Sequence, residues 1–193
     1  RDRGTPGIEM RPIRLIEGGH EVNEVFFTDV RVPIANLVGE ENKGWTIAKY
    51  LLSHERTGIA GVGFSMQALA EVKTIAATIK RGSKRLIDDP LFAARLAEVE
   101  IDLEAMKITN LRMLFRAQEQ GSPGPETSIL KIKGTVINQE LRDLARRALG
   151  PLAAPFPGHF GESNILFGPP DTAFNAARYF NNRKASIFGG SNE

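Results

Sequence analysis

The spacing of apolar residues changes near Gly44, and this change constrains the fold more than any other feature of the sequence. Residues 22–32 are rich in Val and Phe, and their apolar positions alternate as in a β-strand. From Gly44 onward, apolar residues recur at intervals of three and four, which is the period of an amphipathic helix. The sequence therefore predicts a mainly α protein in which a few strands precede an up-down four-helix bundle.

Four helices are expected after the strands. The first is long and runs from Gly44 through Val72. Three glycines lie inside it, and we expect them to allow close helix packing rather than to cradle a phosphate, because no strand precedes them. These glycines are Gly58, Gly61 and Gly63.

The second helix has a clear start, since Asp89 can cap it and Pro90 suits its first helical position. Its buried face is expected to comprise Leu96, Val99, Leu103, Met106 and Leu114. A third helix is expected over residues 129–148, and a shorter one over residues 172–184.

Charge and composition exclude several kinds of partner. Lys and Arg number 25 against 23 Asp and Glu, and a net charge of +2 provides no large field for a polyanion, so nucleic acid is not an expected partner. No apolar run is long enough for a membrane span, and the first residues do not resemble a signal peptide. Because no cysteine suggests an oxidising compartment, we expect a cytoplasmic protein.

The residue types available narrow the chemistry. The three histidines, His20, His54 and His159, are far apart in sequence and none has a second ligand at helical spacing, so no metal site is expected. The absence of cysteine excludes a thiol nucleophile, and no serine lies in a nucleophile elbow. Acid–base or redox chemistry remains.

Residues 53–56 are polar, although the helix around them is otherwise apolar and small residues follow. One interpretation is structural: Glu55 and Arg56 face water or pair with neighbouring side chains. The other is that these residues serve a binding or catalytic site. The residues alone leave both interpretations open.

Four segments together resemble the acyl-CoA dehydrogenase family. Residues 25–33 resemble the last strand of its middle β domain, and residues 39–45 resemble the entry to its first bundle helix. Residues 52–57 are similar to the helical Glu-Arg segment, and residues 188–193 to the C-terminal flavin-site signature. The resemblance implies that residues 1–39 are the tail of the middle β domain. Residues 40–193 would then be the C-terminal helical bundle domain, truncated at its end.

The resemblance also implies FAD-dependent oxidation of the α–β bond of an acyl-CoA thioester, with a glutamate as the base. Many members carry that base in the C-terminal signature, but the matching position here is Gly189, which has no side chain. Isovaleryl- and long-chain-type members carry it directly before the arginine of the first bundle helix, where this sequence has Glu55. Glu55 is therefore the candidate that removes the α-proton while hydride passes to flavin N5.

Further roles follow from the same resemblance. Residues expected to bind the acyl-CoA substrate are Ser53, Arg56, Phe188 and Gly189, the last through its backbone N–H. Residues expected to contact FAD are Gly190, Ser191 and Glu193.

Three family features are absent from the sequence, one of them the glycine-rich stretch before the last helix, which is not recognisable over residues 153–170. The Arg-x-x-Phe-Gly segment, which binds FAD across a subunit interface, is replaced by residues 79–83, Ile-Lys-Arg-Gly-Ser. Its partner glutamine on the next helix is replaced by Pro90. Whether this chain makes that FAD contact stays open, and Lys80 or Arg81 is the alternative contact to a phosphate.

The expected protein is an acyl-CoA dehydrogenase that passes electrons to an electron-transfer flavoprotein and assembles as a homo-tetramer or a heteromeric oligomer. The fragment alone is expected to be inactive. Two alternatives stay open: an acyl-CoA oxidase-like flavoenzyme, and a noncatalytic subunit of a heteromeric acyl-CoA dehydrogenase.

Overall fold

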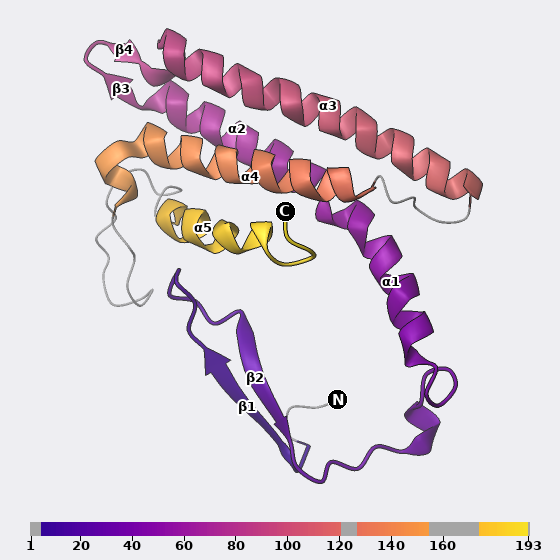
Figure 1. Cartoon of the computed structure of the whole chain (residues 1–193). Coiled ribbons are helices and arrows are strands. Elements are labelled where there is room, and N and C mark those ends of the chain that lie inside the picture. The colour runs from indigo at the N-terminus through magenta and orange to yellow at the C-terminus, as the bar shows by residue number, and fades with distance from the viewer. Residues whose placement is uncertain (1–4, 121–126, 155–173, 193) are drawn as a thin grey trace.

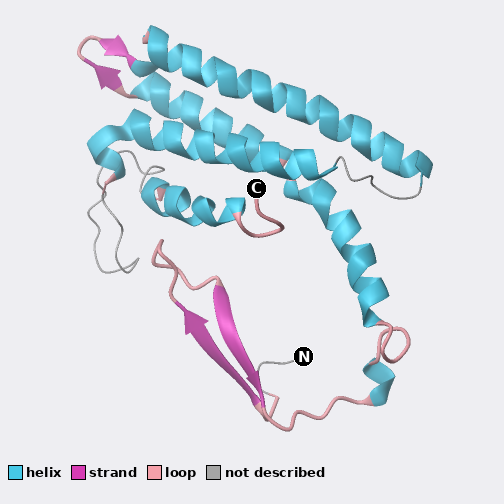
Figure 2. Cartoon of the chain, viewed as in Figure 1, coloured by secondary structure: helices cyan, strands magenta, loops and turns pink. Residues whose placement is uncertain are grey.

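The computed structural model describes residues 5–120, 127–154 and 174–192, and within these it is mainly helical (Figures 1 and 2). An N-terminal hairpin comes first, formed by antiparallel strands β1 (Ile8–Ile13) and β2 (Val22–Phe27). Ile8 faces Phe27 and Ile13 faces Val22 across the pair. The predicted class, mainly helical after a few strands, is confirmed.

The second strand is shorter than its Val- and Phe-rich sequence suggested. It ends at Phe27, and Asp29 follows in the left-handed region with φ +49°. Asp is one of the few non-glycine residues that adopt this conformation readily, so the chain turns here instead of continuing as a strand. A short 3-10 helix, η1 (Ile34–Asn36), leads toward the helices.

The long first helix predicted from Gly44 through Val72 is wrong, because the structure has two helices in its place. Helix α1 (Gly44–Ile59) ends before Gly61, and α2 (Val62–Thr78) begins after it in a new direction (Figure 1). Gly61 is left-handed, with φ +58°, a conformation that glycine adopts without steric cost. The glycine thus permits a corner between two helices rather than only close packing.

Three helices share the main core. Helix α2 is followed by a small basic hairpin of β3 (Lys80–Arg81) and β4 (Lys84–Arg85), a turn of 3-10 helix η2 (Leu86–Asp88), and then α3 (Pro90–Gln120). Helix α4 (Thr127–Leu149) lies against both α2 and α3. The largest fully buried side chains of this core include Val72, Leu103, Leu130, Ile137 and Leu141.

Helix α5 (Asn175–Asn182) packs on α4 and continues into the 3-10 turn η5 (Arg183–Ser186). Another 3-10 turn, η3 (Gly150–Ala153), ends α4. Helix α1 contacts α4 but extends away from the bundle, and a loop that contains η1 connects it to the N-terminal hairpin (Figure 1). The bundle core is therefore formed by α2, α3 and α4, and α5 packs on another side of α4.

The predicted start of the second long helix is confirmed. Oδ1 of Asp89 accepts hydrogen bonds from the backbone N–H groups of Leu91 (3.1 Å) and Phe92 (3.0 Å), and the helix begins at Pro90. The predicted buried face is correct as far as Met106, but Leu114 is 44% exposed. The far end of α3 extends past the part of α4 that covers the rest of the helix (Figure 1).

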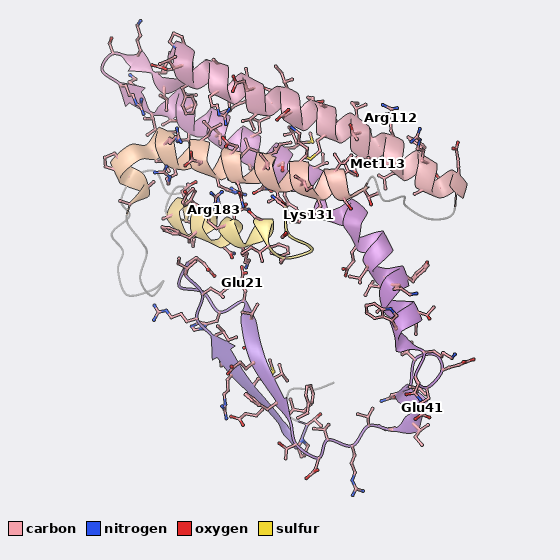
Figure 3. All side chains as sticks on the ribbon, in the orientation of Figure 1. Glu21, Glu41, Arg112, Met113, Lys131 and Arg183 are labelled. Atoms are coloured by element: carbon pink, nitrogen blue, oxygen red, sulfur yellow. The ribbon has the colours of Figure 1, made fainter. Side chains whose placement is uncertain are left out.

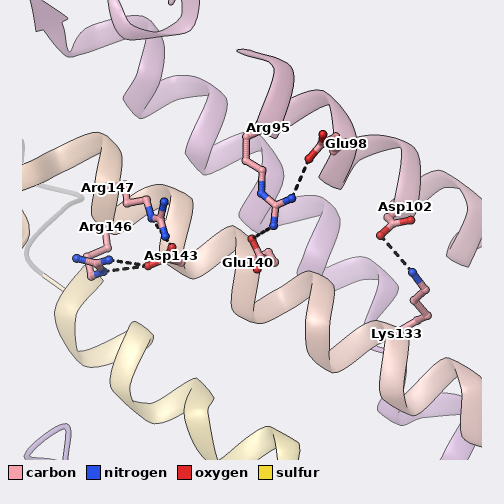
Figure 4. A network of polar contacts seen from close by, with 8 residues as sticks. All are labelled: Arg95, Glu98, Asp102, Lys133, Glu140, Asp143, Arg146 and Arg147. Carbon is pink, nitrogen blue, oxygen red and sulfur yellow. Dashed lines mark hydrogen bonds and ion pairs between the residues drawn. The ribbon is translucent and has the colours of Figure 1, made fainter. Parts of the chain in front are cut away.

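Ion pairs join the exposed edges of α3 and α4 (Figure 4). The guanidinium of Arg95 contacts Glu98 at 2.8 Å on its own helix and Glu140 of α4 at 2.7 Å. Lys133 of α4 contacts Asp102 of α3 at 3.3 Å. Because these side chains are solvent-exposed, each pair is expected to contribute less than about 1 kcal/mol, and the apolar core carries the association of the helices.

Candidate functional site

The chain folds back onto α4 after η5, through a turn built on two glycines. Gly189 and Gly190 both have positive φ, +69° and +101°. The backbone N–H of Asn192 donates to the carbonyl oxygen of Ser186 at 3.0 Å, which closes the segment into a loop. We call residues 188–192 the C-terminal turn.

A buried lysine holds this turn against the bundle. Lys131 of α4 is 4% exposed, and Figure 3 shows it projecting toward the C-terminal segment. Its ammonium group donates to the carbonyl oxygen of Gly190 and, at 2.8 Å, to the side-chain oxygen of Asn192. The position of the turn therefore depends on hydrogen bonds from a buried side chain of α4.

A cavity of about 310 Å³ lies where three parts of the chain meet. Ala60, Gly61 and Phe64 line it from the corner between α1 and α2, and Phe188 lines it from the C-terminal turn. Helix α4 supplies Gly134, Thr135, Asn138 and Arg142. We call it the corner cavity. It brings the end of the predicted Glu-Arg helix next to the predicted C-terminal signature.

A second cavity, of about 230 Å³, shares Arg142, Asn182, Ala185 and Phe188 with the first. Its other lining residues include the cations Arg178 and Lys184. Carboxylates balance these charges: Glu71 of α2 contacts Arg142 at 3.0 Å and Arg178 at 3.3 Å.

Lys184 pairs with Glu21, from the turn of the N-terminal hairpin, at 2.5 Å. The hydrogen bond from Lys184 is the main reason that the pKa of Glu21 lies below its ordinary value, and a further bond from Asn181 acts in the same direction. These contacts join the strand hairpin to the C-terminal helices across a long stretch of sequence.

The structure separates the predicted base from the cavity. Glu55 is exposed on α1, and its carboxylate forms no ion pair with the residues that the structure describes. It precedes Ala60 by five residues, which corresponds to about 7.5 Å along a helix axis. Of the other predicted site residues, Phe188 lines both cavities, and Gly189, Gly190 and Ser191 are exposed. The side chains of Ser53 and Arg56, and all of Glu193, lie outside the described part of the chain.

Sequence reasoning missed the residues that fasten the C-terminal segment. Besides Lys131, these include Gln139, whose amide nitrogen donates to Ser186 Oγ at 2.7 Å and to the carbonyl oxygen of Asn182 at 3.2 Å. Asn182 in turn donates to Asn138 at 2.7 Å. One signal was present: the helical spacing places Lys131 on the same face as Gly134, Thr135 and Ala145, which are small or uncharged.

The fold and the site define the class of this protein: an α-helical bundle domain with a glycine turn beside its core. Comparison with known protein families then identifies the family to which it belongs. The profile of "Acyl-CoA dehydrogenase, C-terminal domain" matches residues 42–193. The chain belongs to the acyl-CoA dehydrogenase family, a family of flavoprotein oxidoreductases of fatty acid metabolism whose members generally bind FAD.

Individual relatives agree with this assignment. The acyl-CoA dehydrogenase IpdE1 of Mycolicibacterium smegmatis is 31% identical over 189 residues, which cover 97% of this chain and 43% of IpdE1. FadE26 of Mycobacterium tuberculosis is 32% identical over 151 residues, covering 76% of this chain and 38% of FadE26. The chain thus spans less than half the length of the curated relatives it matches.

The fold is shared with solved structures as well. A chain of the ChsE4–ChsE5 complex from Mycobacterium tuberculosis is 28% identical, with a TM-score of 0.76 over 98% of this chain and 48% of that one.

In the parts of the chain that the structure describes, no group of three or more His, Cys, Asp or Glu side chains could hold a metal ion. Within the same parts, no helix is long and apolar enough to cross a membrane.

The C-terminal turn leaves room for a ligand to approach its backbone closely. A Cβ atom added at Gly190 would meet nothing within 4 Å, so the space beside this residue is open. Within the described residues, the N–H groups of Gly189 and Gly190 donate to no backbone carbonyl. Backbone N–H groups on a glycine turn that are not used in this way are suitable donors for an anionic or polarised oxygen.

Proposed function

We propose that this chain is part of a full-length enzyme that oxidises the α–β bond of an acyl-CoA thioester with FAD. The observation that carries the proposal is the meeting of two family segments at the corner cavity, the end of the Glu-Arg helix at Ala60 and the C-terminal turn at Phe188. These segments are more than a hundred residues apart in the sequence. Family membership supports the oxidoreductase chemistry.

Glu55 is proposed as the base that takes the α-proton. A carboxylate can accept this weakly acidic proton when its site excludes water and the developing enolate is stabilised. Glu55 is exposed in the described chain, so the substrate, FAD and the other parts of the enzyme would have to cover it. Its position on α1, one turn and a half before the corner cavity, is compatible with that role.

The C-terminal turn is proposed to stabilise the enolate oxygen. The N–H of Gly189 would donate to the thioester carbonyl, which becomes more negative as the α-proton leaves. Phe188 would pack against the acyl group from its place on the corner cavity. Ser53 and Arg56 are proposed to lie along the pantetheine arm, with Arg56 helping to position both substrate and base.

FAD, when bound, would accept the hydride from the β-carbon at N5, so that the acyl-CoA loses one proton to Glu55 and two electrons with the hydride. Gly190, Ser191 and Glu193 are proposed to contact the cofactor, because the open space beside Gly190 allows close approach of a ligand to the backbone. An electron-transfer flavoprotein is the proposed acceptor that reoxidises the flavin.

The domain boundary and the assembly are also proposals. Residues 1–39 would belong to a middle β domain and residues 40–193 to the C-terminal bundle domain. In support, both strands of the hairpin are almost entirely exposed, including Phe27 at 69%, as expected for strands that pack against further protein. A homo-tetramer or a heteromeric oligomer is proposed, and the ChsE4–ChsE5 complex contains two different proteins.

Anaerobic mixing of the purified full-length protein with a panel of acyl-CoA thioesters tests the function. The proposal requires bound FAD and loss of the oxidised-flavin absorbance with at least one thioester. A purified protein that lacks FAD would instead support the noncatalytic subunit. The altered segment at residues 79–83, which includes strand β3 and the turn before β4, is the observation that favours this alternative. Rapid oxygen consumption after reduction would instead identify an oxidase-like enzyme.

A further inference from the structure

Lys131 is a cation in an unusual environment. It is 4% exposed in the middle of the structure, yet its ammonium group makes no ion pair with a carboxylate of the described residues. Its partners are two neutral oxygens, the Gly190 carbonyl and the Asn192 side-chain amide. Burial of an unpaired ammonium group is unfavourable, so an apolar residue at this position would be expected to stabilise the bundle equally well or better.

The two hydrogen bonds from Lys131 are made to the turn that contains two consecutive glycines. Gly189 and Gly190 both have positive φ, and glycine loses more conformational freedom on ordering than any other residue. The bond from Lys131 to the Gly190 carbonyl fixes the peptide plane that follows Gly190. The bond to Asn192 fixes the end of the turn, where the Asn192 N–H also donates to Ser186. A charged donor strengthens both contacts.

We propose that Lys131 is a positioning residue that holds the Gly189–Gly190 turn so that its backbone N–H groups face the thioester carbonyl and the cofactor. This inference rests on the proposed function. Lys131 itself does not react: it acts through the turn, in the way that a supporting side chain fixes an oxyanion donor. Two of its three N–H donors are used by the turn.

The test compares Lys131→Met with Lys133→Met in the full-length protein. Both substitutions remove a lysine from α4 and leave an unbranched side chain, but Lys133 is exposed and pairs only with Asp102 among the described residues. Three quantities are measured: hydrogen exchange at the Asn192 amide, the dissociation constant for FAD, and kcat separately from KM for an acyl-CoA.

Lys131→Met is expected to speed exchange at Asn192 by at least about 10-fold and to weaken FAD binding. It should also lower kcat by up to about 100-fold, the size of effect expected when a catalytic donor is misplaced by about 1 Å. The KM should change less than kcat, because the turn matters most as charge develops on the carbonyl. Lys133→Met should leave all three quantities unchanged.

Two results would overturn the inference: unchanged exchange at Asn192 in Lys131→Met, or faster exchange with kcat and FAD affinity intact. Should the unsubstituted protein neither bind FAD nor oxidise a thioester, the proposed function fails, and with it the catalytic part of this inference; exchange at Asn192 then decides only whether Lys131 orders the turn. If Lys131→Met does not fold, Asn192→Ala serves in its place, because it removes one of the two oxygens that accept from Lys131. This variant should lower kcat and weaken FAD binding, each by less than is expected for Lys131→Met.

Discussion

Gly134 of α4 packs directly against the backbone of Ala60, so that a Cβ atom at Gly134 would overlap the Ala60 carbonyl oxygen and lie 3.0 Å from its Cα. The corner between α1 and α2 therefore rests on α4 at a point where only glycine fits. Both residues also line the corner cavity. The geometry of the proposed site thus depends on this close approach.

Gly134→Ala should destabilise the protein. Overpacking costs about 1–3 kcal/mol, and the clash is with backbone that cannot rotate away. Alanine is the better helix former by about 1 kcal/mol, which offsets only part of that cost. We expect a lower midpoint of thermal unfolding. Gly63→Ala is the matched control, because a Cβ there would meet nothing within 4 Å, and its midpoint should stay the same or rise. Equal effects of the two substitutions would contradict the packing described here.

Glu71→Gln should weaken the attachment of α5. The Glu71 carboxylate serves both Arg142 and Arg178, and the Arg142 side chain is only 17% exposed. A neutral amide would leave this poorly solvated guanidinium without its counter-charge, at an expected cost of about 1–2 kcal/mol in the free energy of unfolding. Urea denaturation measures this cost. Glu98→Gln, which affects an exposed pair, should cost less than about 0.5 kcal/mol. A larger loss in the free energy of unfolding for Glu98→Gln than for Glu71→Gln would contradict this interpretation.

The contact between Glu21 and Lys184 should weaken at acid pH. The pKa of Glu21 is lowered in the folded protein, chiefly by the hydrogen bond from Lys184, so unfolding at low pH takes up a proton. The resulting stabilisation is complete above the ordinary carboxylate pKa of about 4.3 and is lost as the pH falls through the folded-state value. Carboxylate NMR titration should show the low pKa of Glu21 and its return toward the ordinary value in Lys184→Met. An unchanged Glu21 pKa in that variant would rule out the contact as its cause.

The succession of a strand region and then long helices could be predicted from the sequence because it follows from local patterns, but the division of the first helix and the β3–β4 hairpin could not. Asp89 and Pro90 mark a helix start by their own chemistry, and the structure places the start there. The corner at Gly61 could not be predicted in this way, since a glycine within an apolar period is compatible with either a continuous helix or a turn. The turn, rather than a continuous helix, goes with a tertiary contact between Ala60 and Gly134, which no local pattern in the sequence records.

The site was less predictable than the fold. Phe188 and the two glycines of the turn were identified by family resemblance, and the structure brings Phe188 to the corner cavity. Lys131 was missed, because a lysine in a helix normally indicates an exposed position. Its role depends on a turn almost sixty residues later in the chain, which no local pattern records.

The central claim, that Glu55 is the base of an acyl-CoA dehydrogenase, is tested most directly by the rate of anaerobic flavin reduction at saturating acyl-CoA. Full-length protein, its Glu55→Gln variant and a Glu41→Gln control are compared after each is shown to bind FAD; Glu41 is exposed and lies before α1. We predict that Glu55→Gln lowers the rate by at least about 100-fold, the lower range for loss of a general base, while Glu41→Gln does not. Equal rates in all three proteins would show that the base lies elsewhere.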